Sequence, residues 1–308
     1  VKDVRKYCPD AWVINYINPT ALHGAGLRRY APDIKSFALC DGLHMPHIKR
    51  RYALEAGIIS SPEQFTTEVD EDFDLRISGV NHFTFILKAE YKGADVAPAI
   101  AEYTRKVALE ESADTDAKAV YNAAITYSLY QIFGYVPACT GHTKEYLPFW
   151  QGYGDIKEAI PPLKIWETEP RYQLHARMWD QVDGFITGKT PISSYMTTFG
   201  PDHATDIIEN MVGNLGKPFY VNTPNKGAVT NMSDDAFLEL CSDVTMNGIH
   251  PHPVGEMPRG LRGYQELVLD THELTAEAIV KCDHQLLRRA MLTDPIVNTI
   301  AGADAILT

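Results

Sequence analysis

Two residues of types that commonly bind metals stand where predicted strands end. Cys40 closes the apolar run 34–40, and His82 lies in the turn between two further predicted strands. A thiolate and an imidazole, with substrate oxygens completing the shell, suit a borderline divalent metal such as Mn, Co, Ni or Fe(II). Each residue also has a plainer interpretation, because cysteine is often a small buried apolar side chain. His44 and His47 lie nearby and could substitute as ligands or form a surface turn.

A second group of reactive side chains lies in the segment 139–146. Its glycine turn presents His142, Glu145 and Tyr146, which are side-chain types that act as general acids or bases. The alternative is a polar helix cap with Thr143 as the N-cap residue. The residues alone leave both interpretations open.

The elements that position these residues follow from hydrophobic periodicity and turn signals. Asn18 follows a short apolar strand and precedes a proline, which places it at the carboxyl end of that strand, where ligands bind in open α/β sheets. The pattern predicts strands over 11–16, 34–40, 73–77, 83–88, 219–222 and 236–243. It predicts helices over 1–7, 21–30, 49–56, 96–112, 117–133, 170–186, 203–214 and 263–290.

Composition narrows the class of protein. The chain has 308 residues, with 28 basic and 40 acidic side chains and a formal net charge of −12. This balance argues against a nucleic-acid partner, because such binding depends on neutralising phosphates. The five cysteines are widely spaced and never form a CxxC pair, so neither a disulfide framework nor a zinc ribbon is indicated. With no long apolar stretch and no signal peptide, we expect a cytoplasmic protein that does not contact membranes.

A nucleotide site cannot be claimed from the residues. Gly24-Ala25-Gly26 follows a strand and opens a helix, but the third glycine of a dinucleotide fingerprint is absent. The gap from Asn18-Pro19 to Gly24 is also too long for a tight strand-to-helix turn. A glycine-containing helix start is the better interpretation.

Taken together and in order, several segments resemble glycoside hydrolase family 4, the NAD- and metal-dependent glycosidases whose fold is related to lactate and malate dehydrogenases. The resemblance covers nearly the whole chain, and the combination of motifs is specific although no single motif is. The matching segments are 8–19 with its Asn-Pro, 37–42 with its cysteine, 79–85 with its Asn-His, 141–149, 220–227 and 248–251.

The resemblance implies an unusual glycosidase reaction. NAD takes a hydride from C3 of the sugar, a base removes the C2 proton, the C1 substituent leaves, water adds and the hydride returns. Cys40 and His82 would bind Mn²⁺ or another divalent metal, which as a Lewis acid would stabilise the enediolate. Asn18, Asp41 and Asn81 would contact the sugar.

The chain departs from the family pattern in two places. The glycine-rich phosphate loop and the first strands would lie upstream of Val1, so the NAD-binding residues are unknown and we expect a truncated sequence. Thr140 stands where α-acting members carry an aspartate, and a threonine is a poor base. Candidates for the catalytic residues are therefore His142, Glu145 and Thr140, with Tyr146 and Asp41 as further candidates for the base.

The resulting fold prediction combines the end of a Rossmann-type parallel sheet with a dehydrogenase-like α+β domain. Residues 1–45 would end the dinucleotide-binding-type domain, and residues 46–308 would form the domain that binds substrate and metal. The residues after Cys40 and the 145–149 run resemble the α-glucosidase, α-galactosidase and α-glucuronidase members of the family, which implies an unphosphorylated α-hexoside or hexuronide as the carbohydrate substrate. A sugar dehydrogenase without elimination and a non-catalytic, sugar-binding or oligomer-forming relative are the alternatives. The resemblance implies a homodimer or homotetramer, and an incomplete sheet would also leave an open edge that another subunit or the missing segment must cover.

Overall fold

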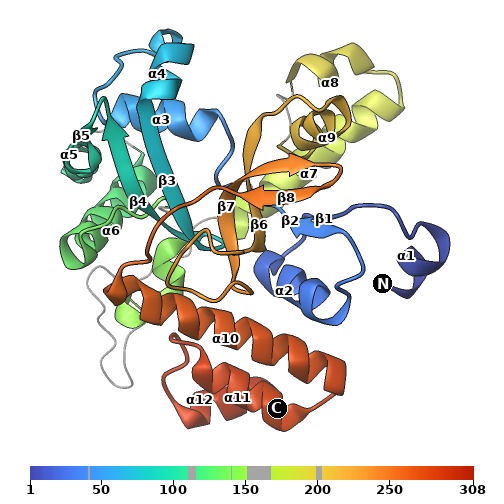
Figure 1. Cartoon of the computed structure of the whole chain (residues 1–308). Helices are drawn as coiled ribbons and strands as arrows, with labels where there is room; N and C mark the ends of the chain where they lie inside the picture. The colour runs from blue at the N-terminus through green and yellow to red at the C-terminus, as the bar shows by residue number, and fades with distance from the viewer. Residues whose placement is uncertain (41, 110–115, 140, 151–167, 199–202) are drawn as a thin grey trace.

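A mixed eight-stranded sheet forms the centre of the computed structural model, which describes residues 1–40, 42–109, 116–139, 141–150, 168–198 and 203–308. Helices cover the sheet, and the last three helices lie together below it (Figure 1). The strand order is β1-β2-β6-β7-β3-β4-β5, and β8 pairs with β7. The strands are β1 (Val13–Asn15), β2 (Ser36–Ala38), β3 (Phe73–Val80), β4 (Phe83–Tyr91), β5 (Ala94–Asp95), β6 (Pro218–Pro224), β7 (Phe237–Thr245) and β8 (Gly248–Pro251).

The sheet joins a parallel part to an antiparallel part, which confirms the predicted fold class. β1 and β2 are parallel, with Asn15 opposite Ala38, and helix α2 (Thr20–Tyr30) connects them. All other strand pairs are antiparallel, beginning with the Ala38–Asn222 pair between β2 and β6. The sheet therefore runs without interruption across the predicted boundary at residue 45, and the division into two domains stays a prediction.

The predicted helices are present except the one over 263–290, and residues 110–112 of the helix predicted over 96–112 lie outside the described residues. Helix α6 begins and ends where the sequence predicts, because the Asp116 side chain caps its first turn and Gly134 ends it with φ 76°. No helix among the described residues is long and apolar enough to cross a membrane. Besides α2, the helices are α1 (Lys2–Tyr7), α3 (His47–Glu55), α4 (Thr67–Asp72), α5 (Ala97–Ala108), α6 (Ala117–Phe133), α7 (Thr168–Ile186), α8 (Ile192–Thr198), α9 (His203–Gly213), α10 (Arg259–Lys281), α11 (His284–Thr293) and α12 (Ile300–Leu307), with 3₁₀ turns η1 (Pro62–Gln64), η2 (Thr143–Tyr146) and η3 (Pro148–Trp150).

The prediction of one helix over 263–290 is wrong. Helix α10 ends at Lys281, where Cys282 takes the left-handed conformation with φ 52°. Helix α11 then starts afresh, because the Asp283 carboxylate accepts hydrogen bonds from the N–H groups of Gln285 and Leu286. Apolar spacing continues through this break, so periodicity alone could not reveal it.

One buried amide links the hairpin of β3 and β4 to helix α10. Gln265 is fully buried, and its Oε1 accepts a hydrogen bond from the Val80 N–H at 2.7 Å. Its Nε2 donates to the Phe83 carbonyl at 2.6 Å. The hairpin tip, which contains Asn81 and His82, is therefore tied to α10 from both sides.

Candidate active site

The two predicted metal ligands meet in the structure. Cys40 lies two residues beyond β2, and His82 lies in the turn between β3 and β4. Strands β6 and β7 lie between β2 and β3 in the sheet. Even so, Sγ of Cys40 lies 2.6 Å from Nε2 of His82. The loop after β2 and the hairpin turn therefore bring together donor atoms 42 positions apart in the sequence.

The backbone at His82 is held in an uncommon conformation. Its φ is 62°, in the left-handed region that glycine favours and that other residues seldom adopt. Such conformations concentrate at functional sites, where the surrounding structure holds them in place. The His82 N–H also donates to Oε2 of Glu239, at 3.4 Å. The turn thus directs the imidazole toward Cys40, although the positive φ of His82 is unfavourable in conformational free energy.

Cys139 contacts the second nitrogen of the same imidazole. Its Sγ lies 3.2 Å from Nδ1 of His82. Burial, with the nearby charge of Glu239, raises the pKa of the Cys139 thiol to about 12, so this sulfur is protonated at neutral pH. A partner on the second ring nitrogen fixes the orientation of a metal-binding histidine. Sequence reasoning included Cys139 in the loop but did not assign it this role.

Glu239 is a site residue that the sequence analysis missed. It is 2% exposed, and burial raises its carboxyl pKa to about 7. It lies in β7 opposite Gly79 of β3 and opposite Asn222 of β6. A lone carboxylate within the apolar run 237–240 was the available signal, because unpaired acidic residues are rarely buried.

His142 and Glu145 form a hydrogen-bonded pair. Nδ1 of His142 donates to Oε2 of Glu145 at 2.9 Å, and both side chains are half-exposed. Burial raises the carboxyl pKa of Glu145, but the His142 hydrogen bond and nearby positive charges outweigh it and leave the pKa lowered. The His142 ring also lies against the His82 ring, with centroids 4.7 Å apart. With Nδ1 occupied, Nε2 of His142 can accept a proton.

The neighbouring Thr143 and Tyr146 have structural roles. The Thr143 hydroxyl donates to the carbonyls of His82 and Cys139, so the alternative prediction of Thr143 as a helix N-cap is wrong. The Tyr146 hydroxyl donates to the Asn81 carbonyl at 2.8 Å, and burial raises its pKa well above the ordinary value. Both residues hold the 3₁₀ turn η2 against the hairpin tip.

The three predicted substrate contacts have different surroundings. Asn81 is buried, and its Oδ1 accepts a hydrogen bond from Nδ2 of Asn222 at 3.1 Å. Asn18 is exposed beyond the end of β1, and its Oδ1 accepts from the Thr20 hydroxyl at 2.9 Å. Because β1 and β2 are parallel, Asn18 and Cys40 follow the same edge of the sheet. Asp41 and the predicted catalytic Thr140 lie outside the described residues.

The cysteine and histidine form a two-residue donor set. Within the described ranges, no three His, Cys, Asp or Glu residues are arranged to hold a metal ion. A thiolate and an imidazole converging at one point fit a divalent transition metal whose remaining positions are filled by substrate or water oxygens. The site is therefore suited to a metal that also binds the substrate.

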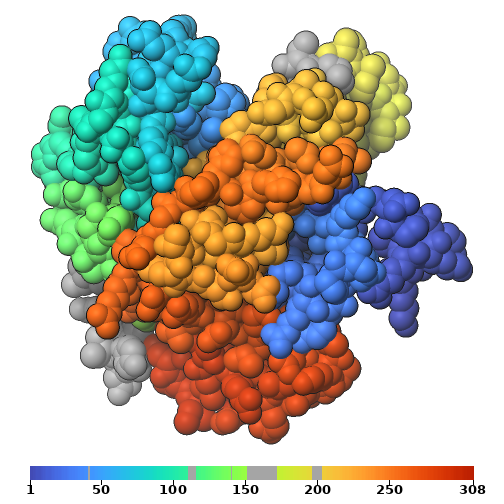
Figure 2. Space-filling view, viewed as in Figure 1, coloured from blue at the N-terminus to red at the C-terminus, as the bar shows by residue number. Residues whose placement is uncertain are grey.

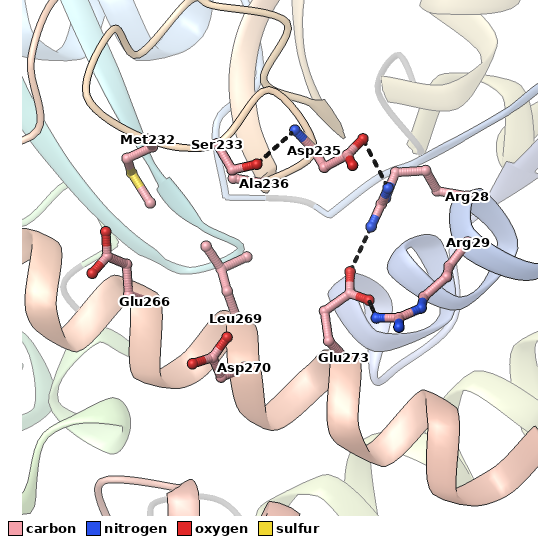
Figure 3. A pocket seen from close by; sticks show the side chains of 10 residues that line it. All are labelled: Arg28, Arg29, Met232, Ser233, Asp235, Ala236, Glu266, Leu269, Asp270 and Glu273. Carbon is pink, nitrogen blue, oxygen red and sulfur yellow. Dashed lines mark hydrogen bonds and ion pairs between the residues drawn. The ribbon is translucent and has the colours of Figure 1, made fainter.

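A separate groove of about 430 Å³ lies between α2, α10 and the segment before β7. Figure 3 shows Arg28 between Asp235 and Glu273, at 3.0 and 2.6 Å, and Arg29 on the same Glu273 carboxylate at 2.7 Å. The nearby Gly24 packs against β7, because a Cβ there would lie 2.3 Å from the Phe237 ring. That glycine lies inside α2, which begins at Thr20 and not at the predicted glycine-containing start, and it makes room for helix packing.

The match to family models identifies the class of protein. The C-terminal domain of family 4 glycosyl hydrolases matches residues 77–297, and the family 4 glycosyl hydrolase model matches residues 1–49. The chain therefore belongs to the family 4 glycosyl hydrolases, as the sequence motifs predicted.

Curated relatives and solved structures agree with this assignment. The chain is 28% identical to an alpha-galacturonidase of Thermoanaerobacter italicus, covering 98% of this chain and 66% of that protein. It is 26% identical to an alpha-galacturonidase of Bacillus subtilis, covering 96% and 65%. A putative glucosidase of B. subtilis shares the fold at a TM-score of 0.79 and 24% identity, over 99% of this chain and 70% of that one. A 6-phospho-alpha-glucosidase from gut microorganisms, solved with NAD and Mn²⁺, has a TM-score of 0.75 at 21% identity, over 99% and 67%. The chain thus spans just under two thirds of the length of these curated relatives.

Proposed function

We propose that this chain belongs to a glycosidase that cleaves an unphosphorylated α-hexuronide by the oxidation–elimination route of its family. The route comprises NAD-dependent oxidation at C3, metal-assisted loss of the C2 proton, departure of the C1 substituent and addition of water. The observation that carries the proposal is the 2.6 Å approach of Cys40 Sγ to His82 Nε2.

Cys40 and His82 would hold the metal, and Mn²⁺ is the proposed ion. When bound, the metal would supply Lewis-acid stabilisation of the negative charge that develops on the sugar oxygens. Cys139 and Glu239 support this pair, because one contacts Nδ1 of His82 and the other accepts from its backbone N–H. The residues therefore fit the ion as an oriented pair of donor atoms that meet at one point and would move slightly apart to bind it.

His142 is the proposed base for the C2 proton. Its Nδ1 donates to Glu145, so its Nε2 is the nitrogen that accepts a proton from the sugar. Its ring lies beside that of His82, which supports a position for His142 next to the proposed metal. Glu145 would stabilise the resulting imidazolium as an orienting carboxylate.

NAD would supply the redox step, accepting the C3 hydride and returning it. The glycines of α2 do not fit a phosphate cradle, because Gly24 packs against the Phe237 ring. We therefore assign no residue of this chain to the dinucleotide.

The substrate proposal rests on the relatives. The relatives from Thermoanaerobacter italicus and Bacillus subtilis are both named alpha-galacturonidase, and a galacturonide is an acidic glycoside. This agrees with the motif context that favoured an α-hexoside or hexuronide. An α-linked galacturonide is therefore the substrate to test first.

The test separates metal binding from turnover. Mn²⁺ binding followed by electron paramagnetic resonance should be lost in Cys40→Ala and His82→Ala and retained in Cys8→Ala, which changes an exposed cysteine of the loop after α1. A digalacturonide incubated with NAD and Mn²⁺ should release galacturonate without net NADH. A Cys40→Ala protein with full Mn²⁺ binding and activity would overturn the proposal.

Two other results would select the alternatives. Accumulation of NADH without release of the C1 substituent would indicate a sugar dehydrogenase. Sugar binding by calorimetry without any turnover would indicate a non-catalytic relative.

A further inference from the structure

Asn222 is an asparagine buried in the middle of the sheet. It lies in β6, opposite Ala38 of β2 on one side and opposite Glu239 of β7 on the other, and it is 0% exposed. Figure 2 shows the gold and orange part of the chain, which contains β6 and β7, at the centre of the molecule between the blue N-terminal part and the cyan part. An amide buried at such a position has exchanged its hydrogen bonds to water for partners in the protein.

The two ends of the Asn222 amide have different surroundings. Its Nδ2 donates to Oδ1 of Asn81 at 3.1 Å. Within the described part of the chain, its own Oδ1 is buried without a hydrogen bond. A buried acceptor that has no donor destabilises the folded state. The contribution of Asn222 to stability therefore does not explain why an amide occupies this position.

Other buried asparagines of this fold use both ends of the amide. Nδ2 of Asn210 donates to the Val244 carbonyl at 2.9 Å, and its Oδ1 accepts from the Lys217 N–H at 2.9 Å. The Asn225 amide likewise bonds backbone groups of the loop after β6. Both amides thus supply partners to backbone groups that need them. Asn222 bonds instead to another side chain, which indicates a role in orienting that side chain.

The hydrogen bond from Asn222 determines which way round the Asn81 amide lies. The oxygen and the nitrogen of an amide have nearly the same size, so hydrogen bonds rather than packing decide between the two orientations. With its Oδ1 bonded to Asn222, Asn81 can offer its Nδ2 end to a ligand. Asn81 directly precedes His82 in the turn between β3 and β4, and the Tyr146 hydroxyl holds its backbone carbonyl. The turn therefore carries an oriented hydrogen-bond donor next to a proposed metal ligand.

We propose that Asn222 is a positioning residue that presents the side-chain N–H groups of Asn81 to a hydroxyl oxygen of the sugar. The inference rests on the proposed function, because it takes the sugar as the ligand of Asn81. In the proposed reaction negative charge develops on sugar oxygens, and an N–H donor stabilises such an oxygen whereas a carbonyl oxygen would repel it. The orientation set by Asn222 therefore matches the chemistry of the site.

The orientation of Asn81 can be tested without a ligand by nuclear magnetic resonance on protein with isotope-labelled asparagine. The side-chain N–H signals of Asn81 are identified by their absence in Asn81→Ala. Asn222→Leu should shift these signals and speed their exchange with water, because the amide loses the donor that holds it. Unchanged Asn81 signals in Asn222→Leu would overturn the proposal.

Asn210→Leu is the matched control, since it replaces an equally buried amide by the same side chain. It should leave the Asn81 signals in place and lower the urea midpoint of unfolding, because two backbone groups lose their partner. Asn222→Leu should keep the midpoint close to that of the parent protein, because the change also removes the unpaired Oδ1. A shift of the Asn81 signals by both variants would overturn the specific link to Asn222.

Calorimetry with galacturonate in the presence of Mn²⁺ tests the consequence for the ligand. Asn222→Leu should weaken binding about 5- to 10-fold, as expected for one hydrogen bond, and should change Mn²⁺ affinity by less than about 2-fold. Asn81→Ala should weaken binding at least as much. The double variant should bind no more weakly than Asn81→Ala alone, because Asn222 acts through Asn81.

Two outcomes would overturn the proposal at this stage, namely full galacturonate binding in Asn222→Leu and additive losses in the double variant. A parent protein that binds no galacturonate would contradict the proposed function instead. The Asn81 signals would then decide by themselves whether Asn222 orients this amide.

Discussion

Gly42 lies against the imidazole of His82. A Cβ at position 42 would come 3.3 Å from Nδ1 and 3.6 Å from Cε1 of that ring, closer than ordinary van der Waals contact on the first atom. Gly42→Ala should therefore displace the ring from its present position against Cys40 and lower Mn²⁺ affinity by roughly 10-fold, as for other changes to residues that orient a metal ligand. Titration followed by electron paramagnetic resonance measures this.

The control for this change is Gly263→Ala on α10, where a Cβ would meet nothing within 4 Å. It should leave Mn²⁺ affinity unchanged. Equal affinities for both variants would contradict the proposed position of the metal.

His82→Gly should separate metal binding from folding. Glycine adopts the φ of 62° without the cost of about 1 kcal/mol that a side chain incurs there, which offsets the lost contacts with Cys40 and Cys139. The free energy of unfolding in urea should change by less than about 1 kcal/mol, while Mn²⁺ binding disappears. The neighbouring Phe83→Ala, fully buried, should instead cost about 3–5 kcal/mol. A large loss of stability in His82→Gly would show that the histidine is structural.

Glu145→Gln should reduce kcat by about 10- to 100-fold with little change in KM, because the amide no longer stabilises a protonated His142. The lowered carboxyl pKa of Glu145 keeps the wild-type pair intact to pH values below the usual carboxyl range. Steady-state kinetics on a galacturonide measure the effect. Glu102→Gln, which breaks an exposed pair with Arg105 on α5, should leave kcat unchanged. Unchanged kcat in Glu145→Gln would exclude the pair from catalysis.

His272 should make stability depend on pH. Burial within α10 lowers its pKa to about 4, whereas in the unfolded chain it titrates near 6.5. Between these values only the unfolded state takes up the proton, so stability falls as pH falls from about 6.5 toward 4, by about 2–3 kcal/mol. His272→Leu should flatten this part of the urea-unfolding profile and match wild type in slope above pH 7. A profile of unchanged slope would show that His272 is not buried in a neutral state.

Glu273 should stabilise the contact between α2 and α10. Its carboxylate accepts from both Arg28 and Arg29, and it is about three-quarters buried. Glu273→Gln should cost about 1–2 kcal/mol, since it removes the shared carboxylate and leaves Arg28 with Asp235 and Arg29 with Glu277 as the remaining charge partners. Lys281→Gln, in an exposed pair with Glu277, should cost at most about 0.5 kcal/mol. Equal costs would show that the groove of Figure 3 is solvated like the surface.

The sequence predicted the ends of helices correctly where nearby capping residues determine them. Asp116 and Gly134 mark both ends of α6 in the sequence, and the structure uses both. The end of α10 was missed because Cys282 is not a residue that usually adopts positive φ. Short β8 was not predicted as a strand, since its residues form one only by pairing with β7.

Some residues of the candidate site could likewise be predicted from the sequence, and others could not. Cys40 and His82 could be predicted because each directly follows a strand and is a metal-binding type. Glu239 could not, because its role depends on β7 lying beside β3, a pairing that sequence periodicity does not specify. Cys139 was visible as a loop residue, but its approach to His82 depends on how the loop folds back over the hairpin.

The two hydrogen bonds from Gln265 give the C-terminal helix a mechanical connection to the metal-binding turn. A displacement of the hairpin tip relative to α10 must break at least one buried hydrogen bond of the Gln265 side chain, at 2.7 Å to Val80 or 2.6 Å to Phe83. The hairpin tip that carries His82 is therefore held in position by Gln265, a residue 183 positions later in the chain. A shift of α10 against its neighbours would be transmitted directly to the angle at which the imidazole meets Cys40.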